Sequence, residues 1–358
     1  MTYRLLLDTS SLMYRAFFAL PPSIADQGGQ PINAVHGYLD MTTRLLTTYR
    51  PDELIHVYDA DWRPAGRVAL YPPYKADRPA DPAALPPQFV RLREILTALG
   101  LPQAEAPAWE ADDAIGSLCA AAQGADHIAI VTGDRDLLQL VQDGNGDAPT
   151  IEVLYTVRGV SALEKFDEAA VQQKYHVPPQ RYVDFAILRG DPSDGLPGVK
   201  GIGEKTAAKL VADYPTLAAL LAAADTQPAR IAANLKAAAD YMAIMAQIVP
   251  VRKAVAVEIS HPVRDDALVA KLAAAYGITG PVKRLLAIMQ TPSQPYAKVR
   301  GTPMKHIDIT PAERKTGELA PDKVATAVAA MAEDGVVALR HAIDLAVVDT
   351  LGAKMLDD

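Results

Sequence analysis

Three short apolar runs in the first half of the chain each lead into an aspartate. They are YRLLLD at 3–8, IHVYD at 55–59, and IAIVT at 128–132, which is followed by Gly133 and Asp134. Continuous apolar runs of this length are typical of buried parallel strands. Helical patterns separate them, over 32–49, 89–99 and 112–122. This alternation predicts an α/β fold with a central, mostly parallel sheet flanked by helices, and a ligand site beyond the carboxyl ends of its strands.

Two later stretches depart from this alternation. Residues 65–88 contain six prolines interleaved with tyrosine, lysine and arginine, so they cannot form one regular helix, and such a long loop is usually functional or disordered. From Tyr182 onward the pattern predicts only helices, at about 203–210, 216–224, 231–248, 266–276 and 281–289. We therefore expect three parts: an α/β core at 1–180 with an arch at about 63–90, a helical region at 181–290, and a linker and tail at 291–358.

Composition narrows the class of protein. Half of the 358 residues are hydrophobic and 22% are charged, which is typical of a globular chain. A single cysteine, Cys119, excludes an intrachain disulfide framework and a cysteine-rich zinc site. The most apolar stretch, 217–224, is far shorter than the ~20 residues of a membrane-spanning helix, and the first residues do not resemble a secretory signal. We expect a soluble, cytoplasmic protein without a membrane partner.

Acidic residues gather where strands end and helices begin. Glu110-Ala-Asp112-Asp113 opens a helix, Asp134 and Asp136 follow a strand, and Asp191 and Asp194 stand in a turn bounded by proline and glycine. Each group has an ordinary structural explanation: helix capping, an ion pair with Arg135, or local turn hydrogen bonds. The total is less ordinary, because nine such positions share this placement: Asp8, Asp59, Glu110, Asp112, Asp113, Asp134, Asp136, Asp191 and Asp194.

Nine carboxylates brought together would repel one another unless cations were bound. Oxygen ligands with few histidines nearby favour Mg²⁺ or Mn²⁺ over zinc. Two such ions roughly 4 Å apart suit in-line attack on a phosphodiester. The chain has 35 basic and 43 acidic residues, a net charge of −8, which argues against a broadly basic surface. Without those nine carboxylates the remainder carries +1, so a local basic surface is compatible with the composition.

Two basic segments are candidates for nucleic-acid binding. Gly198–Thr206 (GVKGIGEKT) places glycines and lysines at a helix start, which suits contact with a phosphate backbone, although a helix-packing turn would have the same pattern. It lacks the spacing of a P-loop. Tyr74, Lys75 and Arg78, with Arg63 and Arg67, combine cations and aromatics as single-strand sites do, although a solvated loop is the alternative. Arg15, soon after Asp8, would either contact a scissile phosphate or balance the carboxylates.

Six motifs, in this order, resemble those of bacterial 5′–3′ exonucleases and flap endonucleases, a family that includes stand-alone enzymes and the N-terminal domain of DNA polymerase I. They are LLLDTSSLMYRAFFALP, VYDADWRPAGR, YPPYKADR, WEADDAIGSLC, IVTGDRDLLQLV and FAILRGDPSDGLPGVKGIGEKTAAKL. The resemblance covers residues 3–290. It implies a PIN-like 5′-nuclease core followed by a helical DNA-binding subdomain with a helix–hairpin–helix (H3TH) at about 191–212.

The resemblance also implies roles for residues. The first metal cluster would be Asp8, Asp59, Glu110 and Asp112, and the second Asp113, Asp134, Asp136, Asp191 and Asp194. Arg15, Lys75 and Arg78 would contact the scissile region, the last two in an arch through which a 5′ single strand passes, with Tyr74 available to stack on a terminal base. The helix–hairpin–helix would bind duplex DNA through Lys200, Gly201, Gly203, Lys205 and Thr206, with a K⁺ ion on the carbonyls of Val199 and Ile202.

The expected protein is thus a monomeric, Mg²⁺- or Mn²⁺-dependent 5′ nuclease that removes 5′ flaps and RNA primers during replication and repair. Two positions depart from the family pattern: Thr9 where glycine is usual, and Gly195 where asparagine is usual. Alternatives are a ribonuclease or toxin-like nuclease with a related acidic site, and a non-catalytic DNA-binding module that keeps the fold. An aspartyl phosphatase would require Asp-x-Asp after the first strand, where this chain has Asp8-Thr9-Ser10.

Overall fold

The computed structural model describes residues 2–157, 160, 162–290, 306–308, 310, 320, 322–323 and 338–340. The chain divides into two compact units, Met1–Ser293 and Gln294–Asp358. In the second unit the description is limited to a few residues, which include a parallel pair of strands, β8 (His306–Asp308) and β9 (Ala338–Arg340). The linker, and most of the helix and strand expected in the tail, lie outside the described residues.

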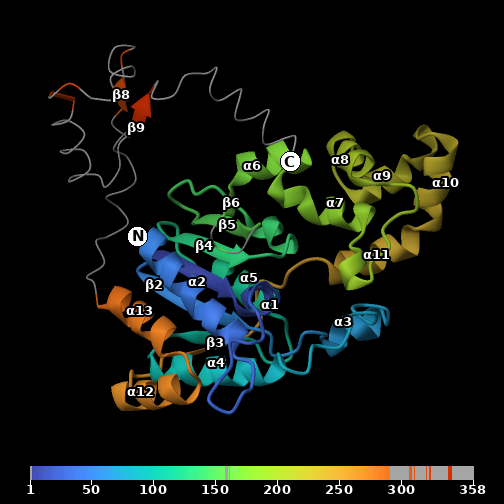
Figure 1. The fold of residues 1–358 in the computed structure, drawn as a ribbon. Coiled ribbons are helices and arrows are strands. Elements are labelled where there is room, and N and C mark those ends of the chain that lie inside the picture. Colours follow the sequence, from blue (N-terminus) through green and yellow to red (C-terminus); the bar gives the residue numbers. More distant parts are fainter. Residues whose placement is uncertain are drawn as a thin grey trace, which may run out of the picture. The chain divides into compact units, whose positions relative to one another are not determined.

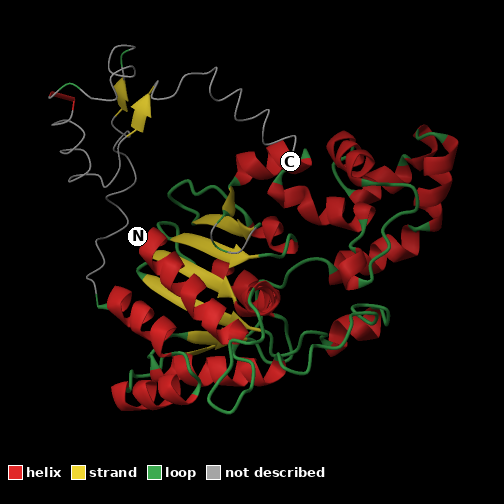
Figure 2. Ribbon diagram, viewed as in Figure 1, coloured by secondary structure: helices red, strands yellow, loops and turns green. Residues whose placement is uncertain are grey.

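A seven-stranded sheet forms the centre of the first unit, in the order β6-β5-β4-β1-β2-β3-β7 (Figures 1 and 2). The five inner strands are parallel, and β6 and β7 pair antiparallel at the two edges. The bounds are β1 Tyr3–Asp8, β2 Glu53–Tyr58, β3 Gln103–Glu105, β4 His127–Thr132, β5 Thr150–Thr156, β6 Leu163–Phe166 and β7 Glu258–Ser260. The expected α/β fold with a mostly parallel sheet is confirmed.

The three apolar runs form β1, β2 and β4, which are neighbours in the sheet. Leu6 of β1 is paired with Ile55 of β2 and with Ile130 of β4, and all three side chains are buried. Strands in the middle of a parallel sheet are covered by helices on both faces, which is why they read as continuous apolar runs. Their parallel register brings the carboxyl ends, and the aspartates that follow, to one edge.

Helices of the α/β part flank this sheet (Figure 2). They are α1 Thr9–Ala19, α2 Asn33–Tyr49, α4 Pro86–Ala98, α5 Ala111–Ala120 and α6 Glu168–Tyr175, with a short 3₁₀ turn, η1, at Asp136–Leu140. The short helix α3, Ala65–Leu70, lies away from the sheet (Figure 1). The proline-rich stretch is not one helix, as expected: it forms the short α3, a run of turns, and the start of α4 at two prolines. Proline suits the first turn of a helix because the missing N–H has no partner there.

The helical region follows η2 (Pro179–Arg181). Its elements are α7 Tyr182–Arg189, η3 Pro192–Asp194, α8 Glu204–Asp213, α9 Leu217–Ala222, η4 Ala224–Thr226, α10 Ala229–Ala237, α11 Ala239–Ile248, α12 Asp266–Ala275 and α13 Thr279–Met289. Two expectations were wrong here. The pattern over 231–248 is two helices, because the backbone at Ala238 leaves the helical conformation (φ −97°, ψ 8°). Residues 258–260 form β7, which completes an edge of the sheet.

One cluster of buried apolar side chains continues from the sheet into the helical region. Leu6 and Ile130 of the sheet belong to the same cluster as Phe185, Leu210 and Met245 of the helices. The helical region is therefore held against the α/β core by shared burial. In the described part of the chain, no helix combines the length and apolarity needed to cross a membrane.

Candidate active site

A cleft opens at the carboxyl edge of the sheet, and most of the predicted carboxylates line it. The predicted carboxylates in its wall are Asp8, Asp59, Glu110, Asp112, Asp134 and Asp191, and the predicted cations Arg15, Lys75 and Arg78 line it too. A smaller adjoining recess is lined by Asp136 and Asp194 together with Glu110 and Asp112. The tertiary structure therefore gathers eight of the nine predicted carboxylates around one connected region.

Asp8 ends β1 and Asp59 follows β2, and both accept hydrogen bonds from distant segments of the chain. Asp8 accepts from the backbone N–H of Ser11 at 3.0 Å and from the Thr132 hydroxyl at 2.6 Å. Asp59 accepts from the Ser10 hydroxyl at 2.5 Å and from the N–H of Ala111 at 2.8 Å. Burial, and next the charge of Asp59, raise the pKa of Asp8 to about 7. These two carboxylates are oriented, yet they repel each other.

Three further carboxylates have oxygen atoms without cationic partners. Among the described residues, Asp112, Asp134 and Asp136 take part in no ion pair. One carboxylate oxygen of Asp136, Oδ1, is buried and has no hydrogen-bond partner. Burial, and then repulsion by neighbouring carboxylates, raise the pKa of Asp112 and of Asp136 well above the usual range. Burying such groups without compensation is costly, so their oxygen atoms are suited to bind cations.

Asp191 and Asp194 stand at the two ends of a tight turn between α7 and α8. Asp191 accepts from the N–H and the hydroxyl of Ser193, at 3.0 and 2.5 Å. Gly195 closes the turn with φ +73°, and a Cβ built there would lie 2.6 Å from the Pro73 carbonyl oxygen. The departure from asparagine at this position thus has a steric reason, because the proline-rich segment passes directly against the turn.

Thr9, the other departure from the family pattern, is accommodated without distortion. It is the first residue of α1 and is fully buried. Its hydroxyl lies 3.3 Å from that of Tyr38 and 3.5 Å from the Leu7 carbonyl oxygen. Thr9 is not among the residues with positive φ, so its backbone has no need of glycine.

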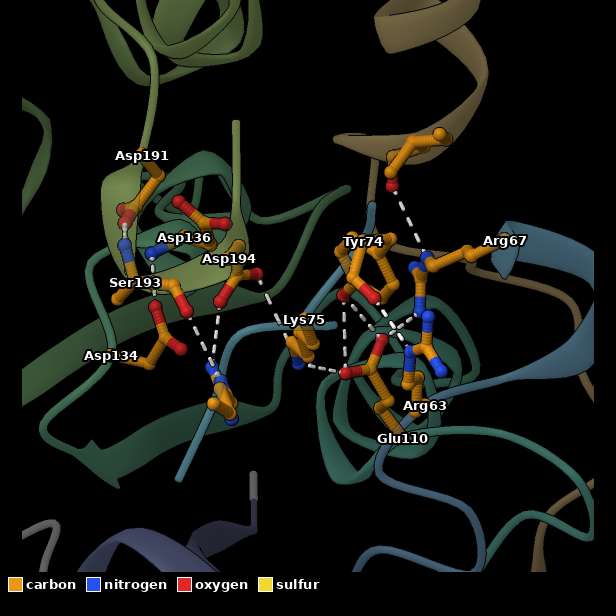
Figure 3. Close-up of polar contacts among 12 residues, drawn as sticks. Arg63, Arg67, Tyr74, Lys75, Glu110, Asp134, Asp136, Asp191, Ser193 and Asp194 are labelled. Atoms are coloured by element: carbon orange, nitrogen blue, oxygen red, sulfur yellow. Dashed lines mark hydrogen bonds and ion pairs between the residues drawn. The ribbon is translucent and has the colours of Figure 1, made fainter. Parts of the chain in front are cut away.

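Lys75 lies between the two sides of the acidic region, with Asp194 on one side and Glu110 on the other (Figure 3). Its ammonium contacts Glu110 Oε1 and is 3.9 Å from Asp194 Oδ2, and Arg78 contacts Asp194 Oδ1 at 2.6 Å. Burial opposes the charge of Lys75, but the carboxylates of Glu110 and Asp194 raise its pKa. The backbone at Lys75 is left-handed (φ 52°), and its N–H donates to the Asp194 carbonyl at 2.9 Å. Such conformations concentrate at functional positions.

The donor set fits hard divalent cations, although it is not assembled as a finished ligand cage. Within the described residues, no three acidic, histidine or cysteine side chains already form a complete metal-binding group. Lys75 and Arg78 supply positive charge to Glu110 and Asp194. Among the residues described, no such cation contacts Asp136, which has an unpartnered oxygen, or Asp112, which neighbouring carboxylates repel. Carboxylate oxygens in this number, without histidine or cysteine, suit Mg²⁺ or Mn²⁺.

Two predicted site residues occupy other roles. Asp113 is fully buried and lines neither cavity; it accepts from Arg67 Nη1 and Nη2 at 2.7 and 2.8 Å and from the Arg252 N–H at 2.9 Å. In this structure it is thus an ion-pair partner of Arg67, in contrast to the expected metal ligand. Tyr74 is only 4% exposed and its hydroxyl donates to Glu110. Its ring is covered by protein, so it is not available to stack on a base.

Arg67 links three separate elements around Glu110 (Figure 3). Besides Asp113, its guanidinium contacts Glu110 Oε2, and its Nε donates to the Ile248 carbonyl at the end of α11 at 3.2 Å. Charged neighbours raise the pKa of Arg67 despite burial. Arg67, expected among the basic residues of a nucleic-acid site, is instead buried, 4% exposed, and supports Glu110.

Arg15 is half-buried in the cleft wall, whereas most of the glycine-rich turn is exposed. Arg15 reaches from α1 along the cleft and donates to the Val157 carbonyl at 3.1 Å. In the turn, Lys200, Gly201, Gly203 and Lys205 are exposed, Thr206 is half-buried, and the side chains of Val199 and Ile202 are buried. Gly201 has φ +76°, and Gly203 begins α8 with no side-chain cap, which leaves the first N–H groups of that helix open.

One residue of the cleft was missed by sequence analysis. Trp62 lines the cleft with its side chain 51% exposed, three residues after Asp59. A tryptophan in a polar turn, in a chain that has only two, was the available signal.

Comparison with known proteins identifies the family. Residues 3–176 match the description "5'-3' exonuclease, N-terminal resolvase-like domain", and residues 177–267 match "5'-3' exonuclease, C-terminal SAM fold". A 5'-3' exonuclease of Streptomyces coelicolor is 45% identical over 305 residues, which cover 80% of this chain and 99% of that one. One of Mycobacterium tuberculosis is 39% identical over 313 residues, covering 80% and 97%.

A solved structure has the same fold. T5 5'-exonuclease with bound divalent metal ions (zinc) aligns with a TM-score of 0.55 at 17% identity, over 80% of this chain and 100% of that one. The α/β core, the helical region and the acidic cleft together define a nuclease with a resolvase-like core. The chain belongs to the 5'-3' exonuclease family, as the motifs indicated.

Proposed function

We propose that this 5'-3' exonuclease is a Mg²⁺- or Mn²⁺-dependent, structure-specific nuclease that acts as a monomer on DNA 5′ flaps and 5′ ends. RNA–DNA primer junctions in replication and repair are the expected natural substrates. The observation that carries the proposal is the cleft itself. Carboxylates that lack cationic partners line the same walls as Lys75 and Arg78, the cations that a scissile phosphate requires.

The residues that would hold the cations are the eight carboxylates around the cleft. In the first cluster these are Asp8, Asp59, Glu110 and Asp112; in the second they are Asp134, Asp136, Asp191 and Asp194. When bound, divalent cations lower the pKa of an attacking water and stabilise the charge that develops on the phosphate. Ser10, Ser11 and Thr132 keep oxygen atoms of Asp8 and Asp59 in fixed orientations through the hydrogen bonds described above, so these ligands need little rearrangement.

Lys75 and Arg78 would have two alternating sets of partners. Without substrate they neutralise Glu110 and Asp194. With substrate, we infer, their donors turn to the non-bridging oxygens of the scissile phosphate, while Arg67 continues to hold Glu110 from the opposite side. Arg15, at the cleft wall, is placed for a neighbouring phosphate. Positive side chains near the phosphate stabilise the transition state more than the ground state, because negative charge builds up there.

The helical region would bind the duplex beside the cleft, in line with the proposed division into a core at 1–180 and a DNA-binding part at 181–290. Lys200, Gly201, Gly203, Lys205 and Thr206 form the contact surface at the start of α8. Open N–H groups at a helix start, together with exposed lysines, favour a phosphate backbone without reading its bases. A K⁺ ion on the carbonyls of Val199 and Ile202 belongs to the same proposal.

The test is cleavage of a labelled 5′-flap duplex, compared with a 3′-flap and a blunt duplex, in EDTA, Mg²⁺ or Mn²⁺. We expect metal-dependent cutting near the 5′-flap junction with the 3′ flap spared. Binding without cutting in every metal would overturn the proposal and favour a non-catalytic DNA-binding module.

A double variant tests the metal-binding residues. Asp134→Asn with Asp136→Asn is expected to abolish cleavage while flap binding survives, because the variant removes cation ligands and leaves the basic contacts in place. Asp213→Asn, an exposed position at the end of α8, is the matched control and is expected to cleave normally. Normal cleavage by the double variant would contradict the assignment.

A further inference from the structure

A rigid turn presents Trp62 to the cleft. On one side of it, the N–H groups of Ala60 and Asp61 donate to the Trp109 carbonyl at 3.2 and 3.1 Å. On the other side, Arg63 donates from its backbone N–H to the Asp61 side chain at 2.9 Å. The indole between these anchors is 51% exposed and, among the described residues, has no hydrogen-bond or ring partner.

The Arg63 side chain extends this bracing to the proline-rich segment. Its Nε donates to the Tyr74 carbonyl at 2.7 Å, and its Nη2 to the Pro72 carbonyl at 2.7 Å. The turn that carries Trp62 is therefore tied to the backbone that carries Lys75 and Arg78. An exposed indole on a braced backbone loses little conformational freedom when it binds a flat partner.

The surroundings of Trp62 select the kind of partner. Trp62, Asp59, Lys75 and Arg78 all line the same cleft. A flat aromatic surface beside phosphate-binding cations is the combination that single-stranded nucleic acid requires, because the cations hold the backbone and the ring stacks on a base. Tyr74, the aromatic expected to do this, is buried beneath the cleft with its hydroxyl on Glu110.

Phe18 is the other strongly exposed aromatic in the described wall of the cleft, but it is poorly placed for the same task. It is 71% exposed and lies ten residues after Asp8, near the far end of α1. Ten residues of α-helix span about 15 Å, so Phe18 is more distant from the carboxylates than the turn that begins at Asp59.

We propose that Trp62 is a specificity-determining residue that stacks on an unpaired nucleobase of the 5′ strand next to the scissile phosphate. The inference rests on the proposed nuclease function. Stacking there would favour substrates whose bases are free to leave the duplex, such as flaps and frayed 5′ ends, over continuous duplex. It would also hold the backbone so that the scissile phosphate lies against Lys75 and Arg78.

A cycle that combines Trp62→Ala with abasic substrates tests the stack. Each abasic flap carries a single abasic site, at one of the nucleotides that flank the cleavage position. With the intact flap, Trp62→Ala is expected to lower kcat/KM about tenfold, the range of one base–aromatic stack, and Trp62→Phe is expected to retain most of the activity. With one of the abasic flaps, the same Trp62→Ala change is expected to cost less than about twofold, because the stacking partner is already absent.

Two controls keep the outcomes distinct. Phe18→Ala is expected to show no coupling to that abasic position, because it lies elsewhere in the cleft. Equal losses for Trp62→Ala on intact and abasic flaps would overturn the stack, as would no loss on either, while leaving the nuclease function standing. Absence of cleavage by the wild-type protein would instead refute the proposed function.

A second measurement does not depend on activity. The chain has two tryptophans, so the Trp109→Phe variant reports on Trp62 alone. In EDTA, addition of a 5′-flap DNA is expected to quench this fluorescence, because stacking places a base against the indole. In the Trp62→Phe variant the remaining tryptophan is the half-buried Trp109, whose ring centroid lies 5.8 Å from the Arg252 guanidinium. The fluorescence of this variant is expected to change little when the DNA is added. Unchanged Trp62 fluorescence on confirmed DNA binding would refute the inference.

Discussion

Replacement of Asp113 distinguishes a buried ion-pair partner from a metal ligand, because the two roles predict stability changes of opposite sign. In the structure, both oxygens of Asp113 receive donors: Arg67 at 2.7 and 2.8 Å, and the Arg252 N–H at 2.9 Å. Asp113→Asn removes the negative charge that a fully buried guanidinium requires. Breaking a buried ion pair by changing one partner costs about 3–5 kcal/mol.

The lower end of that range applies here because Arg67 keeps its contact with Glu110. A loss of about 3 kcal/mol corresponds to a fall in Tm of roughly 5 °C for a unit of the size of Met1–Ser293. The matched variant is Asp136→Asn, since Asp136 has a buried oxygen without a partner and is repelled by its neighbours. Removing that charge in the absence of metal is expected to leave Tm unchanged or to raise it.

Thermal unfolding in EDTA and in Mg²⁺ separates the two roles. In EDTA, Asp113→Asn is expected to unfold well below the wild type, and Asp136→Asn at or above it. Added Mg²⁺ is expected to raise Tm for the wild type and for Asp113→Asn by similar amounts, and by less for Asp136→Asn, because only the last loses a ligand. If Asp113→Asn were as stable as the wild type in EDTA and lost the Mg²⁺ increment, the assignment of Asp113 as an ion-pair partner would be refuted.

Three further predictions follow from single positions. Gly195→Ala is expected to lower Tm and to impair cleavage, because its Cβ would lie 2.6 Å from the Pro73 carbonyl oxygen. Gly29→Ala is the control: Gly29 also has a positive φ, but no atom lies near its Cβ position. In thermal unfolding this variant should show only the smaller cost of the backbone conformation. Burial lowers the pKa of His56 to about 3, so between pH 6.5 and 3 the unfolded chain binds a proton that the native state does not. The free energy of unfolding is therefore highest above about pH 6.5 and falls as the pH drops toward 3, by at most ~1.4 kcal/mol per pH unit. Denaturant titrations of His56→Gln at several pH values should lack this slope. Lys205→Ala is expected to weaken duplex binding, measured by fluorescence anisotropy, and to reduce the slope of log K against log salt concentration by about one. Hydrolysis of a short single strand should be unchanged. Equal losses on both substrates would argue against a duplex-binding role.

Much of the α/β part was predictable because its signals are local. An apolar run followed by an aspartate specifies both a buried strand and a polar group at its carboxyl end, and β1, β2 and β4 confirm this. Parallel pairing then brings Asp8, Asp59 and Asp134 to one edge of the sheet without further information. The break of the 231–248 pattern at Ala238 was not predictable, because apolar spacing continues across it and only the backbone conformation changes.

The amino-acid sequence by itself determined the family, the parallel sheet and the acidic edge, because these depend on patterns within a few residues and on the order of the motifs. Only the tertiary structure decided how individual side chains are used. Asp113 and Asp112 are neighbours in the sequence, yet one meets Arg67 and the other faces the cleft. Arg67 itself contacts a carbonyl 181 residues away, and Tyr74 is covered while Trp62 is exposed. Which charge finds a partner, and which aromatic remains open, depends on contacts between distant segments, and local patterns do not carry that information.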